Sequence, residues 1–274
     1  MDRLAFNAAA FINASRTDRQ MTMNELSNVS TNGFKRSFES TMRTVKAEGA
    51  GFESRMQPQG VNTDYINMKP GTMMVTGRDL DINLNDQAVL GVTGKDGTLA
   101  FTRRGDLRLN SAGSLETGNG ALVRGQAGGP ITIPPGFKVN INTDGSVYAV
   151  NPAQAGLIQP VLIDRLMMRD AGQAPLERRE DGLFSVSGKP LGTDIPASQA
   201  LLSLTPKALE GSNVNPMEVM IKLMEQSRSF EQAINVIKQS KDADQAGSTM
   251  MKPDRKSTRL NSSHVKRSRM PSSA

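Results

Sequence analysis

Apolar and small residues recur at helical spacing near the start of the chain. They fall three, four or seven positions apart and would form one stripe of an amphipathic helix: Leu4, Ala8, Phe11, Ser15, Thr22, Leu26 and Val29. The pair Asn32-Gly33 follows, and glycine readily takes the left-handed conformation that ends many helices. The pattern therefore predicts an N-terminal helical segment of a bundle over residues 1–35.

A more regular stripe lies near the other end of the chain. Its residues alternate three and four apart, which is the spacing of a coiled-coil seam: Met220, Leu223, Ser227, Phe230, Ile234 and Ile237. Pro216 suits a first helical turn, and Asn213 or Asn215 can cap it. We predict a coiled-coil helix within residues 206–250. A long helix that packs only on its own globular core is the alternative.

The period changes between these two ends. Over residues 73–205 apolar residues alternate with polar ones, as at Leu80, Ile82 and Leu84. Three Asp-Gly pairs, beginning at residues 96, 144 and 181, are hairpin turn signals. Short strands at close spacing favour an antiparallel β domain. Residues 36–72 have no clear period, and we interpret them as an extended connector.

These elements predict an α+β fold. An antiparallel β-rich central domain would be flanked by N- and C-terminal helices that form a coiled-coil-like bundle. Helices whose apolar stripes find no partner in the free chain should become ordered when neighbouring subunits cover them.

The positive charge of the chain lies in its last residues. The formal net charge is +6, and six basic residues stand between Arg255 and Ala274, where no acidic residue occurs. The rest of the chain then holds 27 basic and 27 acidic residues, so it gives no reason to expect a nucleic-acid partner. We interpret residues 251–274 as a disordered tail that is non-native from residue 255, with a basic interaction arm as the alternative.

Catalytic and metal-binding chemistry is poorly represented. The chain has no cysteine, and its one histidine, His264, lies in the tail. Arg104-Gly105-Asp106 matches an adhesion tripeptide but fits a turn. Asp81, Asn83 and Asn85 have the first spacings of a calcium loop without the rest of it, and we read them as the solvated face of a strand. We predict no enzymatic activity, cofactor, metal or small-molecule substrate.

Two segments resemble the signatures of a known family. Residues 24–35, Asn-Glu-Leu-Ser-Asn-Val-Ser-Thr-Asn-Gly-Phe-Lys, are similar to the N-terminal signature of flagellar rod and hook proteins, usually written N-N-L-A-N-x-x-T-x-G-F-K, with departures at Glu25 and Ser27. Residues 209–216, Leu-Glu-Gly-Ser-Asn-Val-Asn-Pro, resemble the C-terminal signature, and Arg228-Ser229-Phe230-Glu231 follows inside the predicted helix. The resemblance extends over residues 1–250 in family order.

The resemblance implies a structural subunit of the bacterial flagellar basal-body rod. Members of this family assemble helically with themselves and with homologous proximal- and distal-rod proteins, and they transmit torque for motility. They lie in the periplasm-spanning rod and leave the cytoplasm through the flagellar type III export apparatus without a cleaved signal peptide. The start of this chain is a poor secretion signal, which agrees with that route.

The same resemblance implies an assembly interface. Its expected residues are Leu4, Ala8, Phe11, Asn24, Leu26, Asn28, Thr31, Gly33, Phe34, Ser212, Asn213, Val214, Met220, Leu223, Phe230, Ile234 and Ile237. The opening Met-Asp-Arg-Leu and the length favour the proximal rod, with a distal-rod paralogue as the alternative. A secreted adhesin-type binding protein and a hydrolase that uses carboxylates are further alternatives, but neither accounts for helical stripes at both ends.

Overall fold

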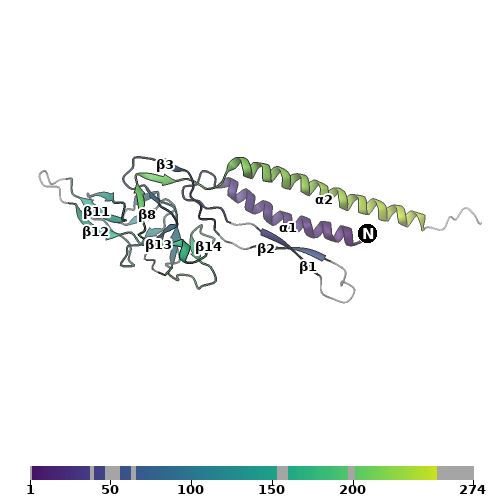
Figure 1. The fold of residues 1–274 in the computed structure, drawn as a ribbon, viewed down its shortest axis with the longest axis horizontal. Coiled ribbons are helices and arrows are strands. Elements are labelled where there is room, and N and C mark those ends of the chain that lie inside the picture. The colour runs from purple at the N-terminus through teal and green to yellow at the C-terminus, as the bar shows by residue number, and fades with distance from the viewer. Residues whose placement is uncertain are drawn as a thin grey trace, which may run out of the picture.

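The structure is a computed structural model that describes residues 2–37, 40–46, 56–62, 66–152, 160–196 and 201–251. The fold is α+β, and it is elongated, with a β-rich part at one end and two helices at the other (Figure 1). Apart from Met251, the predicted tail lies outside the described residues. The helices are α1 (Asp2–Ser27) and α2 (Pro216–Met250).

The other regular elements of the described structure are short strands and one 3-10 turn. In chain order they are β1 (Ser40–Lys46), β2 (Met56–Asn62), β3 (Met73–Val75), β4 (Ile82–Leu84), β5 (Ala88–Thr93), β6 (Leu99–Thr102), β7 (Leu107–Leu109), β8 (Leu115–Thr117), β9 (Leu122–Val123), β10 (Lys138–Ile141), β11 (Ser146–Val150), β12 (Val161–Arg165), β13 (Met168–Asp170), η1 (Ala171–Gln173), β14 (Leu176–Arg178), β15 (Phe184–Val186), β16 (Leu204–Pro206) and β17 (Ala208–Glu210).

The strands pair antiparallel throughout. The largest sheet runs in the order β14-β15-β6-β5-β9-β8-β7, with β13 also paired to β5, and β10-β11-β12 form a second sheet. The predicted Asp-Gly turns lie between paired strands, and Gly97, Gly145 and Gly182 all take positive φ there. A left-handed residue at such a turn matches the twist of the two strands it joins. The antiparallel β core predicted from the sequence is therefore confirmed.

Two apolar clusters fill this core. The larger includes Ile82, Leu84, Leu107, Ile131 and Ile141 from several strands, all buried. The smaller is built around Phe101 and Phe184, which face each other across the paired strands β6 and β15. The β part therefore buries its own apolar surface without help from the helices, which is the main requirement for a stable core.

The last two strand pairs carry the chain back toward the helices. β16 pairs with β4, and β17 pairs with β3, so residues 204–210 are held against residues 73–84. The helical segment predicted for residues 206–250 consequently begins later, at Pro216, where the Asn215 side chain accepts a hydrogen bond from the amide of Met217. Helix α1 ends earlier than residue 35, at Ser27, and a series of turns leads to Gly33.

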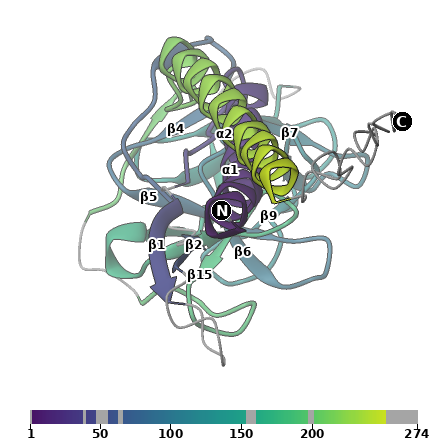
Figure 2. The ribbon, with the colours of Figure 1, turned by 90° about the vertical axis from the view of Figure 1, so that its right-hand side faces the viewer.

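The two helices lie side by side, with α2 projecting beyond the N-terminal end of α1 (Figures 1 and 2). Strands β1 and β2 pair with each other inside the stretch that we interpreted as an extended connector, and β2 lies near α1. Sequence analysis did not predict this strand pair. The two helices and the paired strands therefore leave the β part in the same direction (Figure 1).

Asp81 departs from the expectation of a solvated strand face. It is buried next to β4, and its carboxylate accepts a hydrogen bond of 2.7 Å from the Thr76 hydroxyl. Ile82 and Leu84 are buried in the core, as the alternation predicts, but the Asp81 carboxylate bonds to Thr76 and lies 3.5 Å from Arg78 instead of facing solvent. The reading of Asp81 as solvent-exposed was therefore wrong.

Candidate assembly interface

The segment that follows α1 and the segment that precedes α2 meet the β part at one place, which we call the junction. It consists of residues 28–37 after α1, residues 210–215 before α2, and Arg103 at the end of β6. The amide of Gly33 donates to the carbonyl of Glu210 at 2.7 Å, and the amide of Asn213 donates to the carbonyl of Phe34 at 3.3 Å. The two signature segments therefore bind each other directly through their backbones.

A buried carboxylate lies at the centre of the junction. Glu210 Oε1 accepts from Lys35 Nζ at 2.6 Å, and its Oε2 accepts from Arg103 Nε at 2.8 Å and Nη2 at 2.7 Å. The side chains of Lys35, Arg103 and Glu210 are only 0%, 1% and 2% exposed. This triad joins the N-terminal segment, the C-terminal segment and the β part through one charged group.

Other donors of the triad bond to backbone carbonyls. Lys35 Nζ donates to the carbonyl of Lys69 at 2.7 Å. Arg103 donates to the carbonyls of Leu84, Asp86 and Ala88 at 2.7–2.8 Å, which fixes the guanidinium against β4 and β5. Buried charges are tolerated when they are paired and hydrogen-bonded, and each charged group of this triad has at least two partners.

The electrostatics of the triad depend on Glu210. Burial and the nearby Arg103 guanidinium lower the pKa of Lys35, while Glu210 opposes that shift. The group carries two cations and one carboxylate, so loss of the carboxylate would leave two positive charges buried together. We infer that Glu210 keeps Lys35 and Arg103, and with them the segment after α1 and the β part, bound to each other.

Asparagine side chains complete the junction by bonding to backbone groups. Asn213 Oδ1 accepts from the amide of Arg36 at 2.7 Å, and its Nδ2 donates to the carbonyl of Asn67 at 2.9 Å. Asn28 Nδ2 donates to the carbonyl of Asn24 at 2.9 Å, and its Oδ1 accepts from the Thr31 hydroxyl at 3.1 Å. Asn28 thus fastens the turn after α1, and Asn213 ties the segment before α2 to two other parts of the chain.

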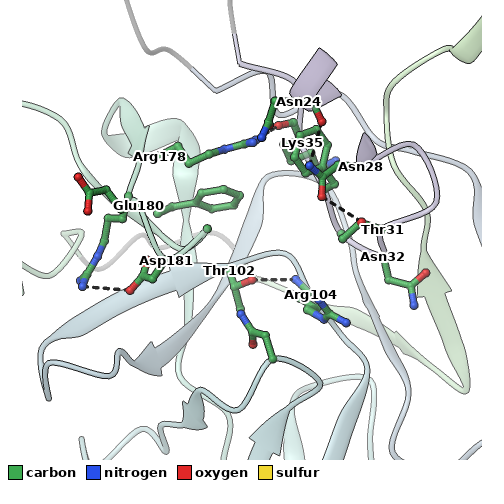
Figure 3. A pocket seen from close by; sticks show the side chains of 16 residues that line it. Asn24, Asn28, Thr31, Asn32, Lys35, Thr102, Arg104, Arg178, Glu180 and Asp181 are labelled. Carbon is green, nitrogen blue, oxygen red and sulfur yellow. Dashed lines mark hydrogen bonds and ion pairs between the residues drawn. The ribbon is translucent and has the colours of Figure 1, made fainter. Parts of the chain in front are cut away.

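A polar pocket of about 300 Å³ opens beside the junction, between the segment after α1 and the turn that joins β14 to β15 (Figure 3). Asn24, Asn28 and Asn32 line one side of it. Arg104 pairs with Asp106, and the guanidinium of Arg178 lies 4.2 Å from the centre of the Phe34 ring and donates to the carbonyl of Lys35. Of the cations around the pocket, Lys35 and Arg178 bond within the junction, whereas Arg104 and Arg179 pair with nearby carboxylates of the β part.

Gly33 is the residue of the N-terminal signature whose identity the geometry explains best. Its φ is +68°, and a Cβ at this position would lie 2.4 Å from the carbonyl oxygen of Arg103. Only glycine allows the backbone of the signature segment to approach the β part so closely.

We expect Gly33→Ala to destabilise the chain by clearly more than about 1 kcal/mol, because a clash with backbone is added to an unfavourable φ. Gly97→Ala is the matched control, since Gly97 also has positive φ (+77°) but faces open space. Urea unfolding of both variants measures the difference. Equal losses would show that the close approach at residue 33 does not matter.

Polar contacts join the two helices next to the junction. Gln226 Nε2 donates to Asp18 Oδ2 at 2.6 Å and to the Thr22 hydroxyl at 3.1 Å, and Lys222 lies 3.5 Å from Asp18. Arg36 spans both helices, because its Nε donates to Glu25 at 3.2 Å and its Nη1 donates to Glu218 at 2.8 Å. These contacts set the register of the helix pair.

The two carboxylates bound by Arg36 behave in opposite ways. Burial raises the pKa of Glu25, against the opposing charges of Arg36 and Lys222, whereas the hydrogen bond from Arg36 lowers the pKa of Glu218. A carboxylate with a raised pKa in the folded state costs stability once the pH rises above its ordinary value, which is 4.5 here. A carboxylate with a lowered pKa contributes stability above that value.

Glu25→Gln is therefore expected to raise the free energy of unfolding at pH 7, with the gain disappearing below pH 4.5. Glu218→Gln should have the opposite sign at pH 7 because it removes a favoured charge. Urea unfolding at pH 7 and at pH 4 tests both variants. A loss of stability for Glu25→Gln at pH 7 would contradict the pKa direction given for Glu25.

The expected interface residues fall into two groups. Asn24, Asn28, Thr31, Gly33, Phe34, Ser212, Asn213 and Val214 lie at or beside the junction, and Ala8, Phe11, Leu26, Met220, Leu223, Phe230, Ile234 and Ile237 lie along the helices. The side chain of Leu4 lies outside the described part of the structure. On α2, Leu223, Phe230 and Ile237 are only half-buried, and Met220 and Ile234 are exposed.

Sequence reasoning missed several residues that hold the junction. Lys35 and Glu210 stand inside the two signatures, so their charges in otherwise polar and apolar motifs were an available signal. Arg103 and Arg178 carried no such signal, because their partners lie far away in the sequence. Arg178 packs on Phe34.

The described residues offer neither a metal centre nor a membrane-spanning helix. Among the described residues, no group of three or more His, Cys, Asp or Glu side chains is placed to hold a metal ion. Neither α1 nor α2, over the residues that the structure describes, is long and apolar enough to cross a membrane.

The known proteins that this chain resembles include flagellar proteins of the rod and hook. The family model for the flagellar basal body rod FlgEFG protein C-terminal matches residues 205–250, and that for the flagellar hook protein FlgE/F/G D1 domain matches residues 85–149. The flagellar basal-body rod protein FlgF of Escherichia coli K12 is 33% identical over 240 residues, which cover 86% of this chain and 93% of the relative.

Further relatives have the same description. FlgF of Salmonella typhimurium LT2 is 31% identical over 240 residues, again covering 86% of this chain and 93% of the relative. The flagellar basal-body rod protein FlgG of Buchnera aphidicola subsp. Acyrthosiphon pisum is 29% identical over 239 residues, covering 80% and 88%. With matches of this length, and with both signatures joined at the junction, the chain belongs to the flagellar basal-body rod protein family, of which FlgF is a member.

Proposed function

We propose that this chain is a structural subunit of the bacterial flagellar basal-body rod, that it lies in the proximal rod, and that it transmits torque for motility. The observation that carries the proposal is the junction, where a buried ion triad binds the segments next to α1 and α2 to the β part. Torque passes through a subunit only if its parts resist rotation against one another. A buried triad with hydrogen bonds to all three parts favours one arrangement of them.

The helix pair supports a role in assembly. Along α2 the buried residues within the described chain are Val219, Ala233 and Ser240, so most of its apolar stripe remains accessible. The close contacts between the helices next to the junction are polar and give register more than stability. We infer that neighbouring subunits, both copies of this chain and homologous rod proteins, complete a coiled-coil-like bundle with these helices.

The remaining parts of the proposal follow from this role. The division into helical ends and a β domain separates the surface for assembly from a core that folds on its own. The chain would reach the rod in the periplasm through the flagellar type III export apparatus without a cleaved signal peptide. It would act without an enzymatic step or a cofactor, as the structural names of its relatives suggest.

Deletion of the gene tests the proposal. Cells without this chain should lose swimming and lack a complete rod, and a plasmid copy of the chain should restore both. Growth rate serves as the control, because a structural part of the flagellum is not needed for growth. Normal swimming by the deletion strain would overturn the proposed function.

A further inference from the structure

A groove lies between the two helices. It has a volume of about 360 Å³ and is lined by Ile12, Arg16 and Arg19 from α1 and by Gln226 and Phe230 from α2. Ile12 and Phe230 are half-buried and give the groove an apolar floor. Arg16 is exposed at the side of it. The groove thus combines apolar surface with positive charge.

Two polar atoms at this groove are buried without a partner. Arg19 Nε and Gln226 Oε1 make no hydrogen bond within the described part of the chain. The amide nitrogen of Gln226 is already used, because it donates to Asp18 and Thr22. Buried polar atoms normally find a partner, and an unpaired one costs on the order of 1–3 kcal/mol. The groove is therefore incomplete in the single chain.

The opposite side of α2 carries an unexplained apolar stripe. Met217, Met220, Ile221 and Met224 are spaced three and four apart, so they share one face of the helix, and they are 49–66% exposed. Lys222 and Gln226, which contact α1, lie about half a turn away from this stripe at 100° per residue. The stripe therefore faces away from α1.

Acidic residues accompany this stripe. Glu225 lies beside Met224, and Glu231 continues the line of the stripe seven residues beyond Met224; both are exposed. Arg228 also lies on this face, so Glu225, Arg228 and Glu231 together carry a net charge of −1. The groove and the stripe are thus both apolar and carry charges of opposite sign, and they occupy different sides of the helix pair.

We propose that the groove of one subunit receives the methionine stripe of a second copy of this chain, with Glu225 or Glu231 meeting Arg16 and Arg19. This inference rests on the proposed rod function and names the contact by which copies would join. Two different surfaces that fit each other make a head-to-tail contact, which gives a ring if the rotation closes and an open helical stack if it does not. Methionine suits the stripe because its flexible side chain adapts to the surface it meets.

Disulfide cross-linking in flagellated cells tests this contact directly. The native chain has no cysteine, so introduced ones report only on their own positions. Asn13→Cys places a thiol at the groove, and Met224→Cys places one on the stripe. A chain with both changes should give an adduct of twice the mass of the chain on mild oxidation, and co-expression of the two singly changed chains should give the same adduct.

The outcomes separate this proposal from the proposed function. Either single variant expressed alone should give no adduct, because each then lacks the opposing thiol. If the double variant gives no adduct in cells that still swim, the rod function stands and the copy-to-copy contact is overturned. An adduct from Met224→Cys alone would also overturn it, since that result needs two stripes to face each other.

Charge reversal gives a second measurement. Changing Arg16 and Arg19 to Glu, or Glu225 and Glu231 to Arg, should reduce the cross-linked adduct at least tenfold, and the four changes together should restore it. If both double variants lose the adduct and the four changes together do not restore it, the charges of Arg16 and Arg19 do not meet those of Glu225 and Glu231.

Discussion

Glu210→Gln is expected to lower the free energy of unfolding by about 3–5 kcal/mol, the usual cost of removing one partner from a buried ion pair. The amide keeps the shape of the side chain but leaves the charges of Lys35 and Arg103 buried together. Because Glu210 also accepts from the amide of Gly71, the variant should loosen the contact between β17 and the segment that leads to β3. Urea unfolding of the purified chain measures this loss.

The control for this variant is Glu116→Gln. Glu116 pairs with Arg108, whose side chain is 53% exposed, and ion pairs at such sites contribute less than about 1 kcal/mol. Cells that make the Glu210 variant should also swim poorly, since the helix pair would no longer be fixed to the β part. A stability loss no larger than that of the control would mean that the triad does not hold the junction.

Ile234→Asp is expected to abolish swimming while leaving the chain folded. Ile234 is 44% exposed on α2, so a carboxylate there remains solvated in the single chain and should change the free energy of unfolding by less than about 0.5 kcal/mol. In an assembled bundle the same position would be covered by a neighbouring helix, and an unpaired buried charge there is strongly unfavourable. The prediction therefore separates folding from assembly.

Asn235→Asp is the control on the adjacent residue, which is exposed and polar. It adds the same charge to the helix without replacing an apolar side chain, and it should leave swimming unchanged. Phe230→Asp should also abolish swimming, but Phe230 is half-buried, so this variant mixes loss of assembly with loss of packing. Normal swimming by the Ile234 variant would contradict the assembly role of α2.

The sequence predicts the helices and turns of this fold better than it predicts the contacts between them. The stripes at both ends identified α1 and α2, and the Asp-Gly pairs located three hairpin turns, because these signals depend on neighbours in sequence. The signature residues Gly33 and Asn213 were also identified, although their roles became clear only from their partners. Gly33 has to be glycine because of the Arg103 carbonyl, which lies 70 residues further along the chain.

What the sequence did not reveal depends on distant pairing. No pattern in the sequence around Arg103 indicated its role, yet its side chain is buried and bonds to Glu210, which is 107 positions away. Strands β1 and β2 have no alternating pattern, since Gly60 and Pro58 interrupt the second of them. The apolar stripe of α1 continues to Val29, but the helix ends at Ser27, where the Asn28 side chain bonds to the carbonyl of Asn24 and to the Thr31 hydroxyl.

The most direct test of the central claim is to identify this chain in purified flagellar basal bodies by quantitative mass spectrometry. Basal bodies from swimming cells should contain it in a fixed ratio to other rod proteins after washing in high salt, which removes loosely bound material. Material from cells that make the Ile234→Asp variant should lack it. Absence of the chain from the basal bodies of swimming cells would contradict the account.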